Sequence, residues 1–291
     1  MQTEDMMLDV SAATGLAERT LIAASLHLPD GMEPPPAHLL LAIHGGGYTR
    51  SYWHPPFADD SYSFARWFTA RGKAVLAIDM LGMGDSARPE PESQLSVATI
   101  AKGHADALRQ VLQRWADTPS VTGIGHSMGG MMIIAQAAAH PALDRVAVVG
   151  WANEPMILGD TDVESLQAGL IPSGYIATPR APMRRLFYAD DVPLALIEAD
   201  EAHASTTPAT LGRAALTPGV MHDAASRITA PVLVVQSVID TSPVPEKEPG
   251  YFTGSARVEL QVLEGAAHCQ NFAGTRAAHW AQLDDWIDRT S

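Results

Sequence analysis

The sequence predicts an α/β fold with a mostly parallel central sheet, flanking helices and a helical insertion. Two observations lead to this prediction. Short apolar runs alternate along the chain with segments whose apolar residues recur at helical spacing. This alternation stops between about residues 154 and 222, where Pro, Met, Ala and acidic residues gather without a clear buried strand. We therefore expect an α/β core, residues 1–153 and 223–291, interrupted by a cap, residues 154–222.

The first part of the chain contains a strand, a helix and a second strand. Residues 38–45, HLLLAIHG, form the kind of apolar run that is typical of a strand buried on both faces. A second such run covers residues 73–80, and residues 59–72 between them have an acidic start, helical spacing and a closing glycine. Two extended stretches, near residues 6–13 and 20–28, predict an antiparallel pair at one edge of the sheet.

The alternation of strands and helices continues to the end of the chain. Residues 97–117 carry apolar residues at intervals of three and four, which predicts one buried helical face. Further apolar runs and predicted helices follow along the sequence and complete a mostly parallel sheet. The remaining predicted strands cover residues 120–127, 145–153, 231–240 and 256–265, and the remaining helices cover residues 131–140 and 273–288.

The segment GHSMG, residues 125–129, has the pattern G-x-S-x-G between a predicted strand and a predicted helix. This pattern indicates a nucleophile elbow, in which two glycines relieve crowding at a sharp turn. The turn holds Ser127 at the carboxyl end of the strand, and the following helix directs its first amides toward developing negative charge. We expect Ser127 to be a nucleophile and the amide of Met128 to be an oxyanion donor.

A glycine-rich loop, HGGG at residues 44–47, follows an earlier predicted strand. Glycine lets the backbone approach a substrate carbonyl oxygen without interference from a side chain. Gly46 is the predicted second oxyanion donor, and Gly47 is the next choice. We interpret His44 as a structural histidine that braces the loop.

A serine needs a base to take its proton, and several histidines compete for this role. His268 follows the last predicted strand, in a loop that can reach over the carboxyl edge of the sheet. His104 and His279 fall within predicted helices and are interpreted as packed or surface residues. His126 adjoins the serine, but we expect its side chain to point elsewhere. The prediction is therefore His268.

The imidazole in turn needs a carboxylate that fixes its tautomer and stabilises the imidazolium. Asp240 ends a predicted strand and precedes a turn-rich segment, which places it at the same edge of the sheet as Ser127. Glu154, after the strand at residues 145–153, is the alternative acid. We favour Asp240.

With these residues in place, the sequence resembles the α/β-hydrolase superfamily. The order Ser127, Asp240, His268 is the family's order of nucleophile, acid and histidine. The segment DMLGMGDS is usually a structural turn in the family, so we assign Asp79 and Asp85 no catalytic role. The matching motifs are HGGG at residues 44–47, DMLGMGDS at 79–86 and GHSMGG at 125–130.

The resemblance implies acyl transfer through Ser127. His268 would deprotonate the serine, the amides of Met128 and Gly46 would hold the oxyanion, and water would hydrolyse the acyl-enzyme without a metal or cofactor. A serine at the elbow argues against the dehalogenase and epoxide-hydrolase branches. We expect a small-molecule substrate of small to medium size and moderate apolarity, cleaved at a carboxylic ester or lactone.

Two other functions remain open at this point. The same triad supports cleavage of a carbon-carbon bond in a β-diketone-like substrate, or acyl transfer to an acceptor other than water. A non-enzymatic binding module ranks last, because such modules commonly lack members of the triad. The apolar cap residues expected to roof a pocket are Met156, Ile157, Leu158, Ile171, Tyr175, Met183, Leu186, Phe187 and Tyr188.

Composition excludes several other classes of protein. Apolar residues make up 46% of the chain and charged residues 18%, which is ordinary for a packed globular protein. A net charge of -14 without a Lys/Arg stripe argues against nucleic-acid binding. The single cysteine, Cys269, allows no intrachain disulfide and fits a reducing cytoplasm.

The sequence also gives no sign of export or of insertion into a membrane. The N-terminus, MQTEDMMLDV, lacks the basic and apolar regions of a secretory signal. No apolar run approaches the roughly 20 residues that span a bilayer. We expect a cytoplasmic protein without a membrane partner, and the sequence leaves a homo-oligomer open.

Overall fold

The computed structural model describes residues 1–32, 35–159, 162–163, 165, 174–177 and 180–290. Within these residues, an eight-stranded sheet has the order β1-β2-β4-β3-β5-β6-β9-β10. Neighbouring strands from β4 to β10 are parallel, whereas β1 and β2 form an antiparallel pair and β2 is antiparallel to β4. The strands are β1 Gln2–Asp9, β2 Leu21–Leu28, β3 His38–Ile43, β4 Ala74–Ile78, β5 Ser120–His126, β6 Arg145–Val149, β9 Val232–Ile239 and β10 Val258–Ala267.

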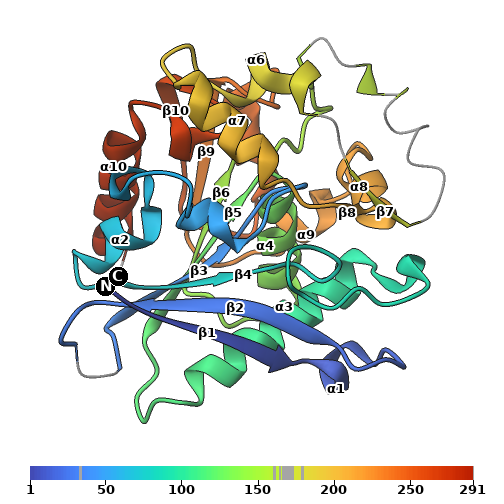
Figure 1. Ribbon diagram of the computed structural model, residues 1–291, viewed down its shortest axis with the longest axis vertical. Coiled ribbons are helices and arrows are strands. Elements are labelled where there is room, and N and C mark those ends of the chain that lie inside the picture. The colour runs from blue at the N-terminus through green and yellow to red at the C-terminus, as the bar shows by residue number, and fades with distance from the viewer. Residues whose placement is uncertain (33–34, 160–161, 164, 166–173, 178–179, 291) are drawn as a thin grey trace.

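Helices cover both faces of this sheet. Side chains of α3 and α4 belong to the apolar core on one face, and side chains of α2 and α10 belong to the core on the other. Figure 1 shows α2 and α10 on one side of the strands and α3 and α4 on the other. These helices are α2 Phe64–Thr69, α3 Val97–Leu112, α4 Met128–Ala139 and α10 Arg276–Arg289. The predicted α/β fold with a mostly parallel sheet is confirmed.

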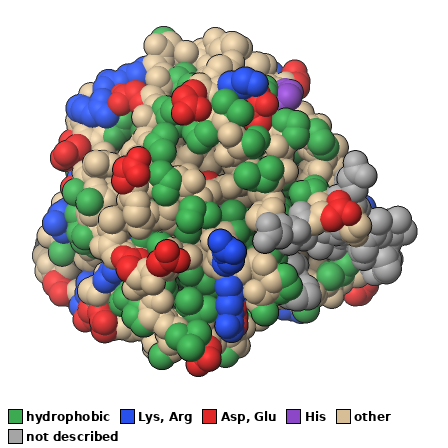
Figure 2. Space-filling view, turned by 90° about the horizontal axis from the view of Figure 1, so that it is seen from above, with side chains coloured by type: hydrophobic (Ala, Val, Ile, Leu, Met, Phe, Trp, Pro, Cys, Tyr) green, Lys and Arg blue, Asp and Glu red, His purple; other side chains and the backbone are tan. Residues whose placement is uncertain are grey.

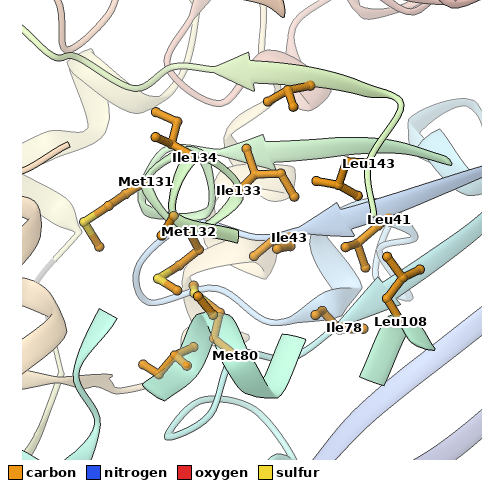
Figure 3. Close-up of a cluster of buried hydrophobic side chains, with 14 of the residues drawn as sticks. Leu41, Ile43, Ile78, Met80, Leu108, Met131, Met132, Ile133, Ile134 and Leu143 are labelled. Carbon is orange, nitrogen blue, oxygen red and sulfur yellow. The ribbon is translucent and has the colours of Figure 1, made fainter. Parts of the chain in front are cut away.

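Helix α4 is the most deeply buried of the four helices that flank the sheet. All of its residues from Met128 to Gln136 are buried, which explains why its apolar side chains show no single preferred face. In the close-up of Figure 3, Ile133 and Met132 of α4 lie against Ile43 at the end of β3. The helix that follows the predicted nucleophile is therefore fixed by the core on several sides.

Some element boundaries differ from the prediction. The helix expected over residues 59–72 is divided into a short 3₁₀ turn, Asp60–Tyr62, and α2. Ser63 separates them because its side chain accepts a hydrogen bond from the amide of Arg66 and so caps α2. The strand expected near residues 6–13 begins at Gln2 and ends at Asp9, and residues Ser11–Thr14 form the short helix α1 instead.

The chain between β6 and β9 contains short helices, as expected, and also a small sheet that the sequence did not predict. The antiparallel pair β7–β8 forms this second sheet. Backbone amides of His268 and Cys269 in the core donate to the carbonyls of Leu186 and Phe187, so α6 is tied directly to the segment after β10. The elements are β7 Tyr175–Ile176, α6 Arg184–Phe187, α7 Leu194–Ala202, β8 Thr207–Pro208, α8 Ala209–Ala215 and α9 His222–Ser226. The limits 154–222 for a separate cap stay a prediction.

The surface is mixed in charge. On the face seen in Figure 2, the described Lys and Arg side chains stand singly or in small groups among acidic and apolar ones, without a basic stripe. In the described part of the chain, every helix is too short or too polar to cross a bilayer.

Candidate active site

Ser127 lies in a strained turn between β5 and α4. Its backbone has φ 55° and ψ -122°, and it is the one non-glycine residue with positive φ in the described part of the chain. The turn is crowded on both sides: a Cβ at Gly125 would overlap the carbonyl oxygen of Gly129, and a Cβ at Gly129 would overlap that of Ile43. Only glycine fits these two positions, so the G-x-S-x-G pattern is a steric requirement of the turn.

The structure brings the other two predicted residues together beside this serine. His268 Nδ1 lies 2.6 Å from Asp240 Oδ1, and both side chains are almost completely buried. Ser127 and His268 line the same cavity. Because a carboxylate can only accept, Nδ1 carries the proton and Nε2 is left with its lone pair. The histidine is thus held in the tautomer that a general base requires.

Backbone and side-chain donors fix the carboxylate of Asp240. Its Oδ2 accepts from the amide of Ser237 at 2.8 Å and from Nε2 of Gln270 at 3.0 Å. Its Oδ1 accepts from the amide of Thr241 at 2.8 Å in addition to His268. Four donors around one carboxylate leave it little freedom to rotate away from the imidazole.

Two backbone amides beside Ser127 have no acceptor among the described residues. The amide of Met128 is the first of α4 and precedes the helix's own hydrogen bonds, and the amide of Gly46 lies in the loop after β3. The side chain of Met128 contacts Gly46, since a Cβ on that glycine would lie 3.0 Å from Met128 Cε. The amide of Gly47, by contrast, donates to Thr207 Oγ1 at 2.9 Å. Of the two predicted loop donors, Gly46 is the one whose amide has no acceptor in the described part of the chain.

The alternative acid, Glu154, lies elsewhere. Its Oε1 accepts from the hydroxyl of Tyr251 at 2.7 Å, and its Oε2 lies 3.8 Å from Lys247 Nζ. None of its hydrogen bonds to described residues reaches His268. The structure therefore pairs His268 with Asp240 and not with Glu154.

His44 and His126 make structural contacts around the site. His44 Nδ1 lies 2.8 Å from the carbonyl of Gly45 and its Nε2 accepts from the amide of Met80, so it braces the loop after β3 as expected. His126 is not among the residues that line the cavity, and its Nε2 donates to the carbonyl of His268 at 2.8 Å. Burial, and then the nearby His268, lower the pKa of His126 well below 6.5, which keeps this ring neutral.

The two helical histidines are packed residues. His104 of α3 and His279 of α10 are both buried. Burial lowers the pKa of His104 to about 3 and that of His279 to about 4. The interpretation of these histidines as packed residues fits their positions.

The cavity next to Ser127 has a volume of about 120 Å³ and mostly apolar walls. Of the cap residues expected to roof it, Met156, Leu158, Met183 and Phe187 do line it. Ile157 is instead 46% exposed, and the hydroxyl of Tyr175 donates to the carbonyl of Pro89 outside the cavity. Leu186, in α6, and Tyr188, directly after it, are buried in the apolar core. Ile171 lies outside the described residues.

Several cavity residues were not predicted from the sequence. Trp151 lies near the end of the strand predicted over residues 145–153, and Thr241 follows the strand predicted over residues 231–240, so a rule that collects every residue at the end of a strand would have included them. Arg180 and Thr207 carry no such signal, because each reaches the cavity from a segment without periodicity. Gln270, which holds Asp240, lies two residues after His268, but no local pattern distinguishes it from its neighbours.

Comparison with known proteins identifies the family. The model of the alpha/beta hydrolase family matches residues 39–280. A search of curated protein sequences finds no significant match.

Solved structures share the fold over almost the whole chain. A thermostable carboxyl esterase from Bacillus coagulans has a TM-score of 0.71 at 17% identity, covering 100% of this chain and 99% of its own. A monoacylglycerol lipase from Paleococcus ferrophilus has a TM-score of 0.67 at 17% identity, covering 93% and 99%. An N-acyl homoserine lactonase has a TM-score of 0.63 at 19% identity, covering 99% and 96%. The family model spans most of the sequence, and the chain belongs to the α/β-hydrolase family.

Proposed function

We propose that this protein is a serine hydrolase that cleaves a carboxylic ester or lactone through an acyl-enzyme. The observation that carries the proposal is the arrangement around one cavity. A strained Ser127 and a His268 whose Nδ1 is bonded to Asp240 line that cavity, and two backbone amides without described acceptors lie beside the serine. These are the parts that acyl transfer requires.

In the first half of the reaction, Nε2 of His268 takes the proton from Ser127 Oγ as the oxygen attacks the substrate carbonyl carbon. The carbonyl oxygen becomes an oxyanion, and the amides of Met128 and Gly46 donate to it. The imidazolium, stabilised by Asp240, then protonates the leaving alkoxide, and the acyl group stays on Ser127. Removing one oxyanion donor typically lowers turnover by about 10² to 10³.

In the second half, water takes the place of the alcohol. His268 accepts a proton from the water as the water oxygen attacks the acyl carbon, and the same two amides hold the second oxyanion. Collapse of this intermediate releases the acid and returns the proton to Ser127. Every proton transfer passes through one nitrogen, Nε2 of His268, which is why its tautomer must be fixed by Asp240.

The cavity favours a small to medium, moderately apolar substrate. Its walls are mainly Met, Leu, Phe, Trp and Ala side chains, and a volume of about 120 Å³ holds a short acyl chain more readily than a long one. Solved structures of this fold include a carboxyl esterase and a lactonase, which supports an ester or lactone as the substrate. We expect the optimal acyl chain to be shorter than octanoyl.

Hydrolysis of p-nitrophenyl esters from acetyl to dodecanoyl tests the proposal, with Ser127→Ala measured beside the wild type. Turnover that depends on the serine and has a chain-length optimum supports an esterase. Labelling of Ser127 by a fluorophosphonate without turnover of any ester or of simple lactones contradicts ester cleavage. That outcome would favour carbon-carbon cleavage or acyl transfer by the same residues.

A further inference from the structure

The loop that carries the Gly46 amide contains three glycines in succession, Gly45 to Gly47. Glycine has little conformational preference of its own, and Gly47 adopts φ +71°. A donor on such a loop stabilises an oxyanion only if other groups fix its direction beforehand. The question is which residues fix it.

The core holds one side of this loop. The carbonyl of Gly45 belongs to the same peptide plane as the amide N–H of Gly46. This carbonyl lies 2.8 Å from Nδ1 of His44 and accepts from the amide of Tyr48 at 3.2 Å. The plane of the donor is thus anchored at its oxygen end.

The segment between β6 and β9 holds the other side of the loop. Thr207 Oγ1 accepts from the amide of Gly47 at 2.9 Å. The carbonyl of Gly47 accepts from the amide of Ser205 at 2.8 Å and from Nη2 of Arg180 at 2.6 Å. Both peptide groups of Gly47 are therefore fixed by residues that lie more than 130 positions later in the chain.

Arg180 is itself held in place by a buried network. Its Nη1 donates to Asp200 Oδ2 at 2.6 Å, and its guanidinium lies 3.8 Å from the centre of the Tyr48 ring. The hydroxyls of Tyr48 and Tyr188 also donate to Asp200 Oδ2, at 2.9 and 2.6 Å. Burial raises the pKa of Asp200, and Arg180 opposes that rise. The network fixes the guanidinium between the carboxylate and the carbonyl of Gly47.

We propose that Arg180 and Thr207 are positioning residues that hold the glycine loop so that the Gly46 amide is aimed at the oxyanion, an inference that rests on the proposed function of Ser127. Neither side chain needs to touch the reacting atoms for this role. The inserted segment would then contribute to the rate of the chemical step as well as to the walls of the cavity.

Thr207→Val tests this role, because valine keeps the shape of threonine and removes the acceptor for the Gly47 amide. Two rates are measured: kcat for p-nitrophenyl acetate, and the second-order rate of phosphonylation of Ser127 by a fluorophosphonate. We expect both rates to fall about 10- to 100-fold, below the limit of about 10³ for complete loss of one oxyanion donor, while KM changes less than threefold. Thr207→Ser retains the hydroxyl, and we expect both rates within threefold of wild type.

Thr206→Val is the matched control. The hydroxyl of Thr206 is buried without a hydrogen-bond partner among the described residues, so the same chemical change one position away should leave both rates unaltered. Arg180→Lys is the second test, should Thr207→Val fail to fold. An ammonium group cannot reproduce the forked contact with Asp200 and Gly47, and we expect both rates to fall about tenfold.

Folded Thr207→Val or Arg180→Lys protein that keeps both rates within threefold of wild type overturns the inference, even if its melting temperature is lower. Such a result would leave these residues a role in stability alone. Failure of the proposed function has a different signature: the wild type would be phosphonylated at Ser127 but would hydrolyse no ester. The phosphonylation rates of the variants would still test the positioning role in that case.

Discussion

Ser127 adopts a backbone conformation that glycine tolerates better than any residue with a side chain. Its φ of 55° with ψ of -122° lies outside the regions open to L-residues without strain. Such a conformation costs about 1 to 3 kcal/mol and persists only where the surroundings impose it. Here the surroundings are the buried helix α4 and two glycines, Gly125 and Gly129, where the neighbouring backbone leaves no room for a Cβ atom. In the proposed function, this strained turn is what presents the Ser127 hydroxyl to the cavity.

This strain predicts that Ser127→Gly is more stable than Ser127→Ala. Both variants should be inactive, but only glycine relieves the positive φ. After the greater flexibility of glycine in the unfolded chain is subtracted, we expect a difference of about 1 kcal/mol in the free energy of unfolding. Urea unfolding at one pH measures it. Equal stabilities would show that the turn is not strained in solution.

The pairing of His268 with Asp240, and not with Glu154, leads to a second prediction about single residues. Asp240→Asn keeps the size of the side chain but removes its charge and alters the tautomer of His268, so we expect kcat to fall by up to about 10⁴. Glu154→Gln changes a carboxylate that bonds Tyr251 instead, and we expect kcat within threefold of wild type. Kinetics of the two purified variants provide the measurement. A large loss in Glu154→Gln with a small one in Asp240→Asn would reverse the assignment.

The sequence could indicate Ser127, His268 and Asp240 because each follows a recognisable strand at one edge of the sheet. It placed Gly46 ahead of Gly47 as the loop donor, but it gave no physical reason for the difference between their two amides. That distinction depends on Thr207, which is 160 positions away along the chain and occupies the amide of Gly47. Local patterns carry no information about which of two adjacent amides a distant side chain will engage.

Among elements, helix α7 forms two ion pairs with other residues of the segment between β6 and β9, one of them buried and the other more exposed. Asp200 pairs with Arg180, and both side chains are less than a tenth exposed. Glu201, the next residue, pairs with Arg184, whose side chain is 39% exposed. Two ion pairs on one helix thus differ mainly in their access to water.

This difference predicts unequal losses of stability. Asp200→Ala leaves the guanidinium of Arg180 buried without its carboxylate, and we expect the free energy of unfolding to fall by about 3 to 5 kcal/mol. Glu201→Ala removes a solvent-screened pair and should cost less than about 1 kcal/mol. Chemical unfolding of both variants at the same ionic strength checks the expectation. Equal losses would mean that the buried pair contributes no more than the exposed one.

The apolar runs of the sheet predicted its parallel strands well, because strands buried on both faces leave a strong local signal. The pair β7–β8 left none, since each strand has only two residues and one of them contains Pro208. The division of the helix at residues 59–72 depends on the capping side chain of Ser63, which competes with the apolar periodicity. Where a single hydrogen bond decides the boundary of an element, the spacing of apolar residues does not predict that boundary.

At the scale of the whole molecule, parallel connections bring the ends of β3, β5, β9 and β10 to one edge of the sheet, and the candidate site is built there. The sequence predicted this convergence because the alternation of strands and helices requires it. It did not predict that the segment between β6 and β9 would contact the glycine loop. That contact depends on how two separately patterned parts pack, which no residue spacing records.

The whole fold also buries histidines that should make its stability depend on pH. Burial lowers the pKa of His27 and of His279 to about 4 and that of His104 to about 3, whereas an unfolded chain has values near 6.5. Between these limits the unfolded state binds more protons than the folded state, so the free energy of unfolding falls as the pH drops below 6.5. Above pH 6.5 these histidines are neutral in both states, so their protonation no longer lowers the free energy of unfolding.

His104→Leu should flatten this dependence. Each buried histidine contributes a loss of up to about 1.4 kcal/mol per pH unit, so removing one should reduce the change between pH 7.5 and 5.5 by about 1 kcal/mol. Gln136→Leu is the matched control: Gln136 is also buried, neither atom of its amide has a partner among the described residues, and it does not titrate. That variant should shift stability equally at both pH values. Urea unfolding at pH 7.5 and 5.5 gives the free energy of unfolding of the wild type and both variants. If this free energy changes as much with pH in His104→Leu as in the wild type, protonation of His104 does not contribute to the dependence.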